Sequence, residues 1–101
     1  MHVDIPPILI QGAMEVECNQ LISRLTSAEQ IEIDGWMYYA GLLEGIPTVV
    51  AHTRIGMVNA SASTLLGISR FHPCAVINQG TAGAHDPKIV KCDIVVAKRC
   101  V

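Results

Sequence analysis

The sequence predicts an α/β fold, in which a parallel sheet with an antiparallel extension is flanked by helices. Two short apolar runs, Ile8–Ile10 and Cys74–Ile77, lead into segments that contain glycine, as buried parallel strands commonly do. Two segments between these runs have helical periodicity, and Asp34-Gly35 is a hairpin signal. Parallel and antiparallel pairing are therefore both expected within one sheet.

The N-terminal quarter predicts a lead-in, a strand and a helix. Residues 1–7 are expected to form a loose lead-in, because Pro6 and Pro7 cannot donate hydrogen bonds to a sheet ladder. The first strand follows at Ile8–Ile10. A one-faced helix comes next, with apolar residues at positions i, i+3, i+4 and i+7: Cys18, Leu21, Ile22 and Leu25. Thr26-Ser27 is then expected to loosen the chain.

The antiparallel extension is predicted by two turn signals. Asp34-Gly35 joins Ile31–Ile33 to Trp36–Ala40, and Glu44-Gly45 leads into a further strand at Ile46–His52.

The second half of the chain predicts one helix and two strands. A helix is expected from Met57 to Arg70, with a run of small residues at 59–63 that would let it lie close to a sheet. Cys74–Ile77 predicts a central strand and Asp93–Ala97 a last one.

The composition is more apolar than a small independent domain needs. Of the 101 residues, 50% are hydrophobic and 16% are charged, and the mean hydropathy is +0.40. The chain could hide apolar surface in an oligomer, or it could be part of a larger domain. Since two helices cannot cover five or six strands, we expect residues 8–101 to be the N-terminal portion of a single larger domain.

Several classes of function are disfavoured. The net charge is −2 and there is no basic run, so no nucleic-acid surface is expected. No apolar run approaches the ~20 residues of a membrane helix, and the N-terminus lacks the basic region of a secretory signal, so we expect a cytoplasmic protein with no membrane partner. The histidines and cysteines show no metal-ligand spacing, so no metal or cofactor is expected. The cysteines are interpreted as free, buried thiols: Cys18, Cys74, Cys92 and Cys100.

Two loops are candidates for a small-molecule site, because ligands of α/β sheets bind past the carboxyl ends of strands. Glu15 and Glu17 follow the first strand and its glycine. Either could act as a catalytic base, or both could simply stabilise the positive end of a helix. Gly80–Gly83 follows the second apolar run, where backbone N–H groups could bind a ligand, although a plain turn fits as well.

Four segments together resemble one family. They are Ile10–Glu17, Arg54–Ala60, Ile77–Gly83 and Asp93–Val96. In this order and spacing they look like the N-terminal part of a 5′-methylthioadenosine/S-adenosylhomocysteine nucleosidase, of the purine nucleoside phosphorylase superfamily. The resemblance implies a mixed, partly barrel-like sheet flanked by helices, and usually a homodimer. It also implies hydrolysis of the N-glycosidic bond of adenine thionucleosides to adenine and a thioribose, a reaction of methionine salvage.

The resemblance also assigns roles to individual residues. Glu17 matches the glutamate that activates the attacking water, which leaves Glu15 as helix-end electrostatics. Met14 would line the sugar or 5′ side of the substrate and Ile55 would contact the 5′ substituent. The floor under ribose and base would be shaped by Thr81, Ala82 and Gly83.

Two alternatives stay open. One is a phosphorylase or another nucleosidase of the same superfamily. Hexameric phosphorylases carry arginines where this chain has Asn78 and Glu17, and a carboxylate would repel phosphate, so water is favoured as the nucleophile. However, Arg54 stands where the family usually has glycine, and it could bind an anion or pair with a carboxylate. The other alternative is a non-catalytic binding, storage or dimerising remnant.

The isolated 101-residue chain is expected to be inactive or nearly so. By the resemblance, the aspartate that protonates adenine lies outside these residues, and general acid catalysis contributes about 10²–10⁴-fold. Adenine release from 5′-methylthioadenosine, followed by chromatography, checks this expectation. Robust release that disappears on Glu17→Gln would contradict it.

Overall fold

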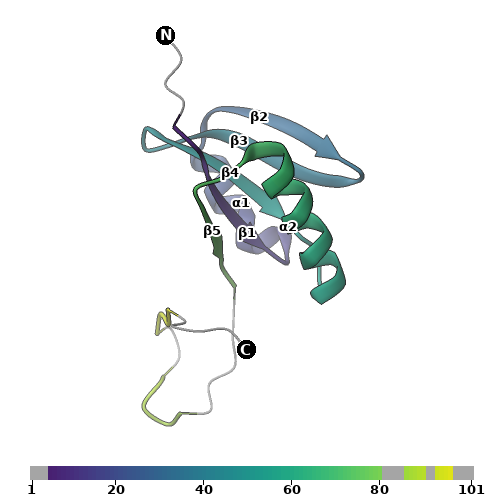
Figure 1. The fold of residues 1–101 in the computed structure, drawn as a ribbon. Helices are drawn as coiled ribbons and strands as arrows, with labels where there is room; N and C mark the ends of the chain where they lie inside the picture. Colours follow the sequence, from purple (N-terminus) through teal and green to yellow (C-terminus); the bar gives the residue numbers. More distant parts are fainter. Residues whose placement is uncertain (1–4, 81–85, 91–92, 97–101) are drawn as a thin grey trace.

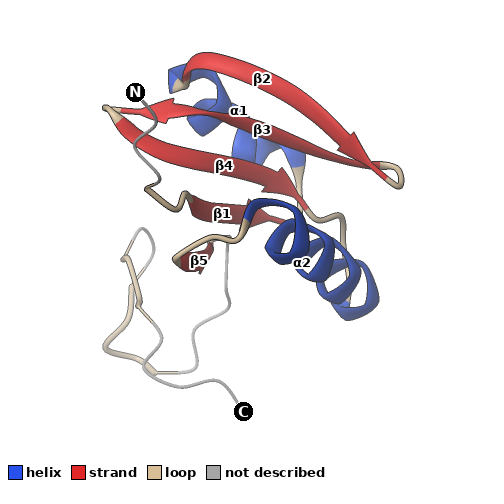
Figure 2. Cartoon of the chain, turned by 45° about the horizontal axis from the view of Figure 1, so that its top comes forward, coloured by secondary structure: helices blue, strands red, loops and turns tan. Residues whose placement is uncertain are grey.

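The fold is a mixed sheet with one helix on each face. The computed structural model describes residues 5–80, 86–90 and 93–96. The elements in chain order are β1 (Ile8–Gly12), α1 (Glu15–Arg24), β2 (Thr26–Ile33), β3 (Trp36–Leu43), β4 (Ile46–His52), α2 (Met57–Phe71) and β5 (Ala75–Asn78). The five strands lie in the order β2-β3-β4-β1-β5, and Figures 1 and 2 show α1 and α2 on opposite faces. The predicted α/β class is confirmed.

The parallel part of the sheet consists of β4, β1 and β5. β1 pairs with both neighbours, so that Gly12 lies opposite His52 and Gln11 lies opposite Asn78. The predicted first strand is confirmed and continues to Gly12. The consequence for function is that these three strands end at the same edge of the sheet.

The antiparallel extension is also confirmed. β3 pairs antiparallel with both β2 and β4, and the two connecting turns are those predicted. Asp34 and Gly35 have φ values of 49° and 92°, and Glu44 and Gly45 have values of 50° and 82°. Positive φ at both central residues is what a two-residue hairpin turn of the right twist requires.

Thr26-Ser27 was expected to loosen the chain, and that expectation is wrong. Thr26 begins β2, and the irregularity is confined to a register shift between Thr26 and Glu29, with Ser27 at φ 56°. Gly41 of β3 makes the close approach possible, because a Cβ atom there would lie 2.9 Å from the Thr26 carbonyl oxygen. The chain therefore forms a β-bulge in β2 at the position where an irregular segment was expected.

The two C-terminal strands differ from expectation. The predicted central strand begins at Ala75 and lies at the end of the strand order, so its four residues are exposed. Residues 93–96 form a loop rather than a strand, and residue 97 lies outside the described part of the chain. Asp93 makes local contacts instead: its carboxylate accepts a hydrogen bond from the Val90 N–H at 2.9 Å. An apolar run such as residues 93–96 indicates a tendency to be buried, but it forms a strand only where another strand pairs with it.

The core lies between the sheet and α2. Leu9, Tyr38, Val49 and Ala51 are buried there, and Leu66 and Phe71 of α2 pack against them. The Tyr38 hydroxyl donates to the carbonyl oxygen of Ser63 at 2.5 Å, which anchors α2 to β3. Burial raises the pKa of the Tyr38 hydroxyl above its ordinary value, against the opposing effect of its hydrogen bond with Ser63.

Small residues bring α2 close to the sheet. Its buried residues are Ser63 and Gly67, which agrees with the expectation that small residues allow a close approach. A Cβ atom at Gly67 would lie 3.1 Å from Leu9 Cδ2 and 3.2 Å from Tyr38 Cε2. On the other face, the buried Cys18 of α1 donates to the carbonyl oxygen of Ala51 at 3.4 Å. Neither helix of the described chain is long and apolar enough to cross a membrane.

Gly67→Val is expected to lower the free energy of unfolding by about 1–3 kcal/mol, because the added methyl groups overlap Leu9 and Tyr38. Urea denaturation measures this change. The control is Ser69→Val, at an exposed position of the same helix, where the expected change is within about 0.5 kcal/mol. Equal stability of the two variants would show that α2 does not depend on close packing at Gly67.

Candidate functional site

The candidate site lies where β1, β4 and β5 end. Ala13 and Met14 follow β1, residues 53–56 follow β4, and Gln79 follows β5. The Gln79 N–H donates to the carbonyl oxygen of Gln11 at 2.9 Å, so the third loop begins beside the first. This edge is the usual ligand-binding edge of an α/β sheet.

Thr53 joins the first two of these loops. Its N–H donates to the carbonyl oxygen of Gly12 at 2.9 Å, and its hydroxyl lies 3.3 Å from the same oxygen and 3.0 Å from the carbonyl oxygen of Arg54. The Trp36 indole Nε1–H donates to the Thr53 carbonyl oxygen at 3.2 Å. Thr53 is buried, so these bonds hold the loop after β4 against both β1 and the β2–β3 turn.

His52 adds a second tie between the loops. Its Nε2 lies 2.8 Å from the carbonyl oxygen of Ala13. Because a carbonyl oxygen can only accept, Nε2 carries the proton in this contact. The imidazole therefore fixes the backbone that leads from β1 into α1.

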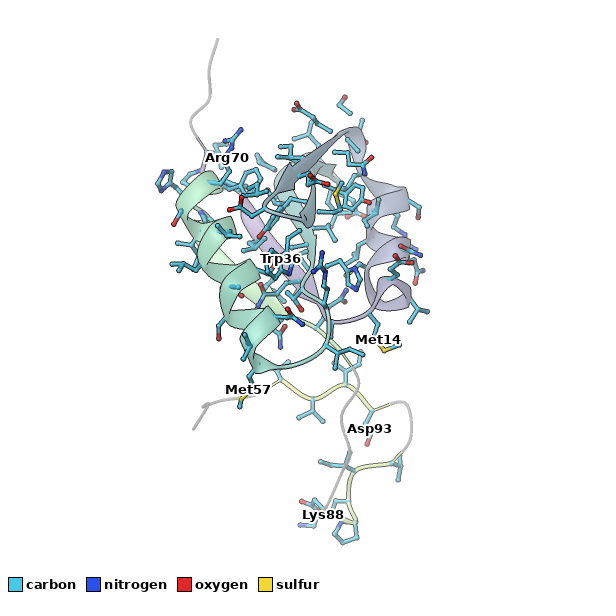
Figure 3. The ribbon with its side chains drawn as sticks, turned by 90° about the vertical axis from the view of Figure 1, so that its right-hand side faces the viewer. Met14, Trp36, Met57, Arg70, Lys88 and Asp93 are labelled. Carbon is cyan, nitrogen blue, oxygen red and sulfur yellow. The ribbon has the colours of Figure 1, made fainter. Side chains whose placement is uncertain are left out.

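The loops that follow β1 and β4 line an open pocket of about 400 Å³. Its lining residues are Ala13, Met14, Glu15, His52, Arg54, Ile55 and Asn59. Met14 and Ile55 are 49% and 72% exposed, which leaves their side chains available to an apolar group. Figure 3 views this edge of the sheet, with Met14 at the start of α1 and Met57 at the start of α2.

Arg54 is held in an unusual backbone conformation. Its φ is 68°, in the left-handed region that disfavours side chains with a Cβ atom. Its guanidinium donates from Nη2 to the Gly35 carbonyl oxygen, and its Cζ lies 4.9 Å from the centroid of the Trp36 ring. Among the described residues it forms no ion pair, so the expected pairing with a carboxylate is not seen there. The side chain instead connects the pocket to the β2–β3 turn.

The structure brings two of the predicted site residues together. Met14 and Ile55, which are 41 positions apart in the sequence, line the same pocket. Glu17 lies in the first turn of α1, and its side chain is outside what the structure describes. Thr81, Ala82 and Gly83 also lie outside the described residues. Their roles, and that of Glu17, stay predictions.

Sequence reasoning missed two pocket residues, His52 and Asn59. His52 ends β4 as Gly12 ends β1, so the strand-end rule applied to Ile8–Ile10 would also have found it. Asn59 follows Ile55 by one helical turn, and its Nδ2 donates to the Ile55 carbonyl oxygen at 2.9 Å. Asn59 therefore shapes the loop that presents Ile55.

The described residues contain no group of three or more His, Cys, Asp or Glu side chains arranged to hold a metal ion. Cys18 is buried, as expected, whereas Cys74 is a free thiol that is exposed. Cys74 directly precedes the edge strand β5, and its thiol lies 3.6 Å from the carbonyl oxygen of Pro6. Cys92 and Cys100 lie outside the residues that the structure describes.

Comparison with known proteins defines the family. The family model of the phosphorylase superfamily matches residues 7–101, and the chain belongs to this superfamily. The curated 5′-methylthioadenosine/S-adenosylhomocysteine nucleosidase of Staphylococcus aureus strain JH9 is 38% identical over 88 residues, which cover 87% of this chain and 39% of that protein. The chain thus spans well under half of the length of the curated relatives it matches.

Solved structures agree with this assignment. One is the 5′-methylthioadenosine/S-adenosylhomocysteine nucleosidase from Colwellia psychrerythraea 34H in complex with adenine, with a TM-score of 0.83 and 33% sequence identity. The match covers 89% of this chain and 37% of the Colwellia chain. The nucleosidase from Neisseria meningitidis, in complex with methylthio-immucillin-A, has a TM-score of 0.75 and 33% sequence identity. This match covers 78% of this chain and 34% of the Neisseria chain. The family resemblance and the fold class inferred from the sequence are confirmed.

Proposed function

We propose that the whole protein containing this chain hydrolyses the N-glycosidic bond of adenine thionucleosides, giving adenine and a thioribose. One observation carries the proposal: Met14 and Ile55 meet in one pocket at the carboxyl ends of β1 and β4. These are the residues that the family resemblance assigns to the 5′ side of the substrate. The 38% identity to a nucleosidase acting on this class of substrate supports the same reaction.

In the proposed mechanism Glu17 is the general base. A water oxygen attacks the anomeric carbon of the sugar and transfers a proton to the Glu17 carboxylate. The bond between this carbon and the adenine nitrogen breaks, and its electron pair leaves with adenine, which takes up a proton. The helix dipole favours an ionised carboxylate in the first turn of α1, where Glu17 stands. We assign the acid that protonates adenine to the part of the protein outside these residues.

The remaining predicted residues complete the substrate site in this proposal. Met14 and Ile55 contact the 5′ substituent, and Thr81, Ala82 and Gly83 form the floor under ribose and base. The free thiol of Cys74 fits a reducing compartment, so we place the reaction in the cytoplasm, as a step of methionine salvage.

A phosphorylase is the second candidate, and Arg54 is the observation that favours it, since phosphorylases bind phosphate through arginine. One feature opposes it. Glu15 lines the same pocket, and its carboxylate would repel a phosphate dianion.

Glu17→Gln is expected to lower kcat for 5′-methylthioadenosine about 10²–10⁴-fold in the whole protein, because the amide cannot accept the proton from water. Adenine release measures the change. The matched control is Glu32→Gln, at an exposed position of β2, which should retain the wild-type rate. The rate should also be independent of added phosphate. Release of adenine that requires phosphate would identify a phosphorylase instead.

We further propose that the protein is a homodimer whose interface includes the outer face of α2. Met57, Val58 and Leu65 are all more than half exposed on that face. With Ser61 and Ala62 they line a hollow of about 430 Å³, where small residues allow a second surface to come close. Contiguous exposed apolar surface of this kind is typical of protein–protein contacts.

Val58→Glu is expected to shift the whole protein from dimer to monomer, because a carboxylate would be buried in an apolar contact. Light scattering after size-exclusion chromatography measures the mass. Asn19→Glu, at an exposed position of α1 on the opposite face of the sheet, should stay dimeric. A wild-type protein that runs as a monomer would contradict the proposal.

A further inference from the structure

Two opposite charges line the apolar pocket without being paired. Glu15 comes from the start of α1 and Arg54 from the loop after β4, and both line the pocket that contains Met14 and Ile55. Within the described chain neither forms an ion pair, with the other or with a third group. A pocket that presents a carboxylate, a guanidinium and an apolar wall is complementary to a ligand with both charges on an aliphatic stem.

Arg54 is prepared to bind an anion. One nitrogen, Nη2, donates to the Gly35 carbonyl oxygen, and the guanidinium lies over the Trp36 ring. A guanidinium has five N–H donors, and these contacts leave most of them unused. Holding the planar group from one side reduces the rotamer freedom that an incoming carboxylate would otherwise have to restrict.

The backbone of Arg54 adds to this argument. A φ of 68° is unfavourable for an arginine, whereas a glycine adopts it freely. Strained conformations of this kind concentrate at ligand sites, where the side chain serves the site. Here the strained residue is the one that carries the positive charge of the pocket.

We propose that Arg54 and Glu15 select thionucleosides whose 5′ substituent ends in an α-amino acid. The inference rests on the proposed nucleosidase function and concerns the same pocket. The substrate carboxylate binds the free N–H groups of Arg54, and its ammonium group binds the Glu15 carboxylate. The thioether stem lies along Met14 and Ile55. A substrate with an uncharged 5′ substituent gains only the apolar contacts.

The experiment compares two substrates with tails of similar length. S-Adenosylhomocysteine has a zwitterionic tail and 5′-butylthioadenosine has an uncharged one. The ratio of their kcat/KM values, measured with the whole protein, reports recognition of charge. Arg54→Gln keeps an N–H donor for Gly35 but removes the charge, so the ratio should fall about tenfold. Glu15→Gln should lower the same ratio.

A matched control is Arg70→Gln. The Arg70 guanidinium also lies over an aromatic ring, with Cζ 5.3 Å from the centroid of Phe71, and Figure 3 shows Arg70 at the opposite end of α2 from Met57. This variant should leave the ratio unchanged. Arg54→Gly serves as a second test, because glycine suits the positive φ and keeps the loop foldable, and it should lower the ratio as well.

The outcomes separate the inference from the proposed function. If both Arg54 variants keep the wild-type ratio, the inference is wrong, even where both substrates are hydrolysed. A raised KM for phosphate with an unchanged ratio would make Arg54 a phosphate ligand and would also overturn it. If the wild type hydrolyses neither substrate, the proposed function fails. In that case calorimetry measures the dissociation constants of the two substrates for the wild type and for the Arg54 variants. The inference holds if the preference for S-adenosylhomocysteine falls about tenfold in the variants, and it is wrong if the preference is unchanged.

Discussion

The carbonyl oxygen of Gly12 is the point on which the pocket depends. It accepts the Thr53 N–H at 2.9 Å and lies 3.3 Å from the Thr53 hydroxyl. Gly12 is the last residue of β1, and Thr53 follows its partner His52 at the end of β4. Because Thr53 is buried and also bonded through its own carbonyl oxygen to Trp36, the chain leaves β4 in one direction only. That direction carries Arg54 and Ile55 toward Met14. Without this junction the two loops would not share a pocket.

Packing of α2 supports the same geometry from the other side. Tyr38 bonds to Ser63 and touches Phe71, with ring centroids 5.5 Å apart, while Gly67 allows the helix to approach Leu9. These contacts fix the axis of α2, and therefore the position of its first turn, from which Asn59 holds the Ile55 carbonyl oxygen. The packing of small and aromatic residues in the core thus determines the position of Ile55 at the rim of the pocket.

Features set by neighbouring residues could be predicted from the sequence, and features set by distant partners could not. Asp34-Gly35 and Glu44-Gly45 specify their own turns, so both hairpins were predicted correctly. The apolar runs at 75–78 and 93–96 look alike, yet only the first pairs with another described strand, since pairing depends on residues elsewhere. In the site, Met14 and Ile55 were found through the family resemblance. The place of His52 at the end of β4 could have been predicted in the same way as that of Gly12, but its hydrogen bond could not, because the partner is the Ala13 carbonyl oxygen, 39 positions away.

The contact between Arg54 and the β2–β3 turn makes a surface hairpin part of the site. Gly35 has a φ of 92°, and a Cβ atom on it would lie 3.6 Å from Arg54 Nη2. The turn is exposed, and within the described chain its side chains form no hydrogen bond with the residues that line the pocket, so it can vary more freely than those residues. Sequence drift in this turn could therefore reposition the guanidinium and alter which substrates are accepted, while every residue of the pocket wall stays the same.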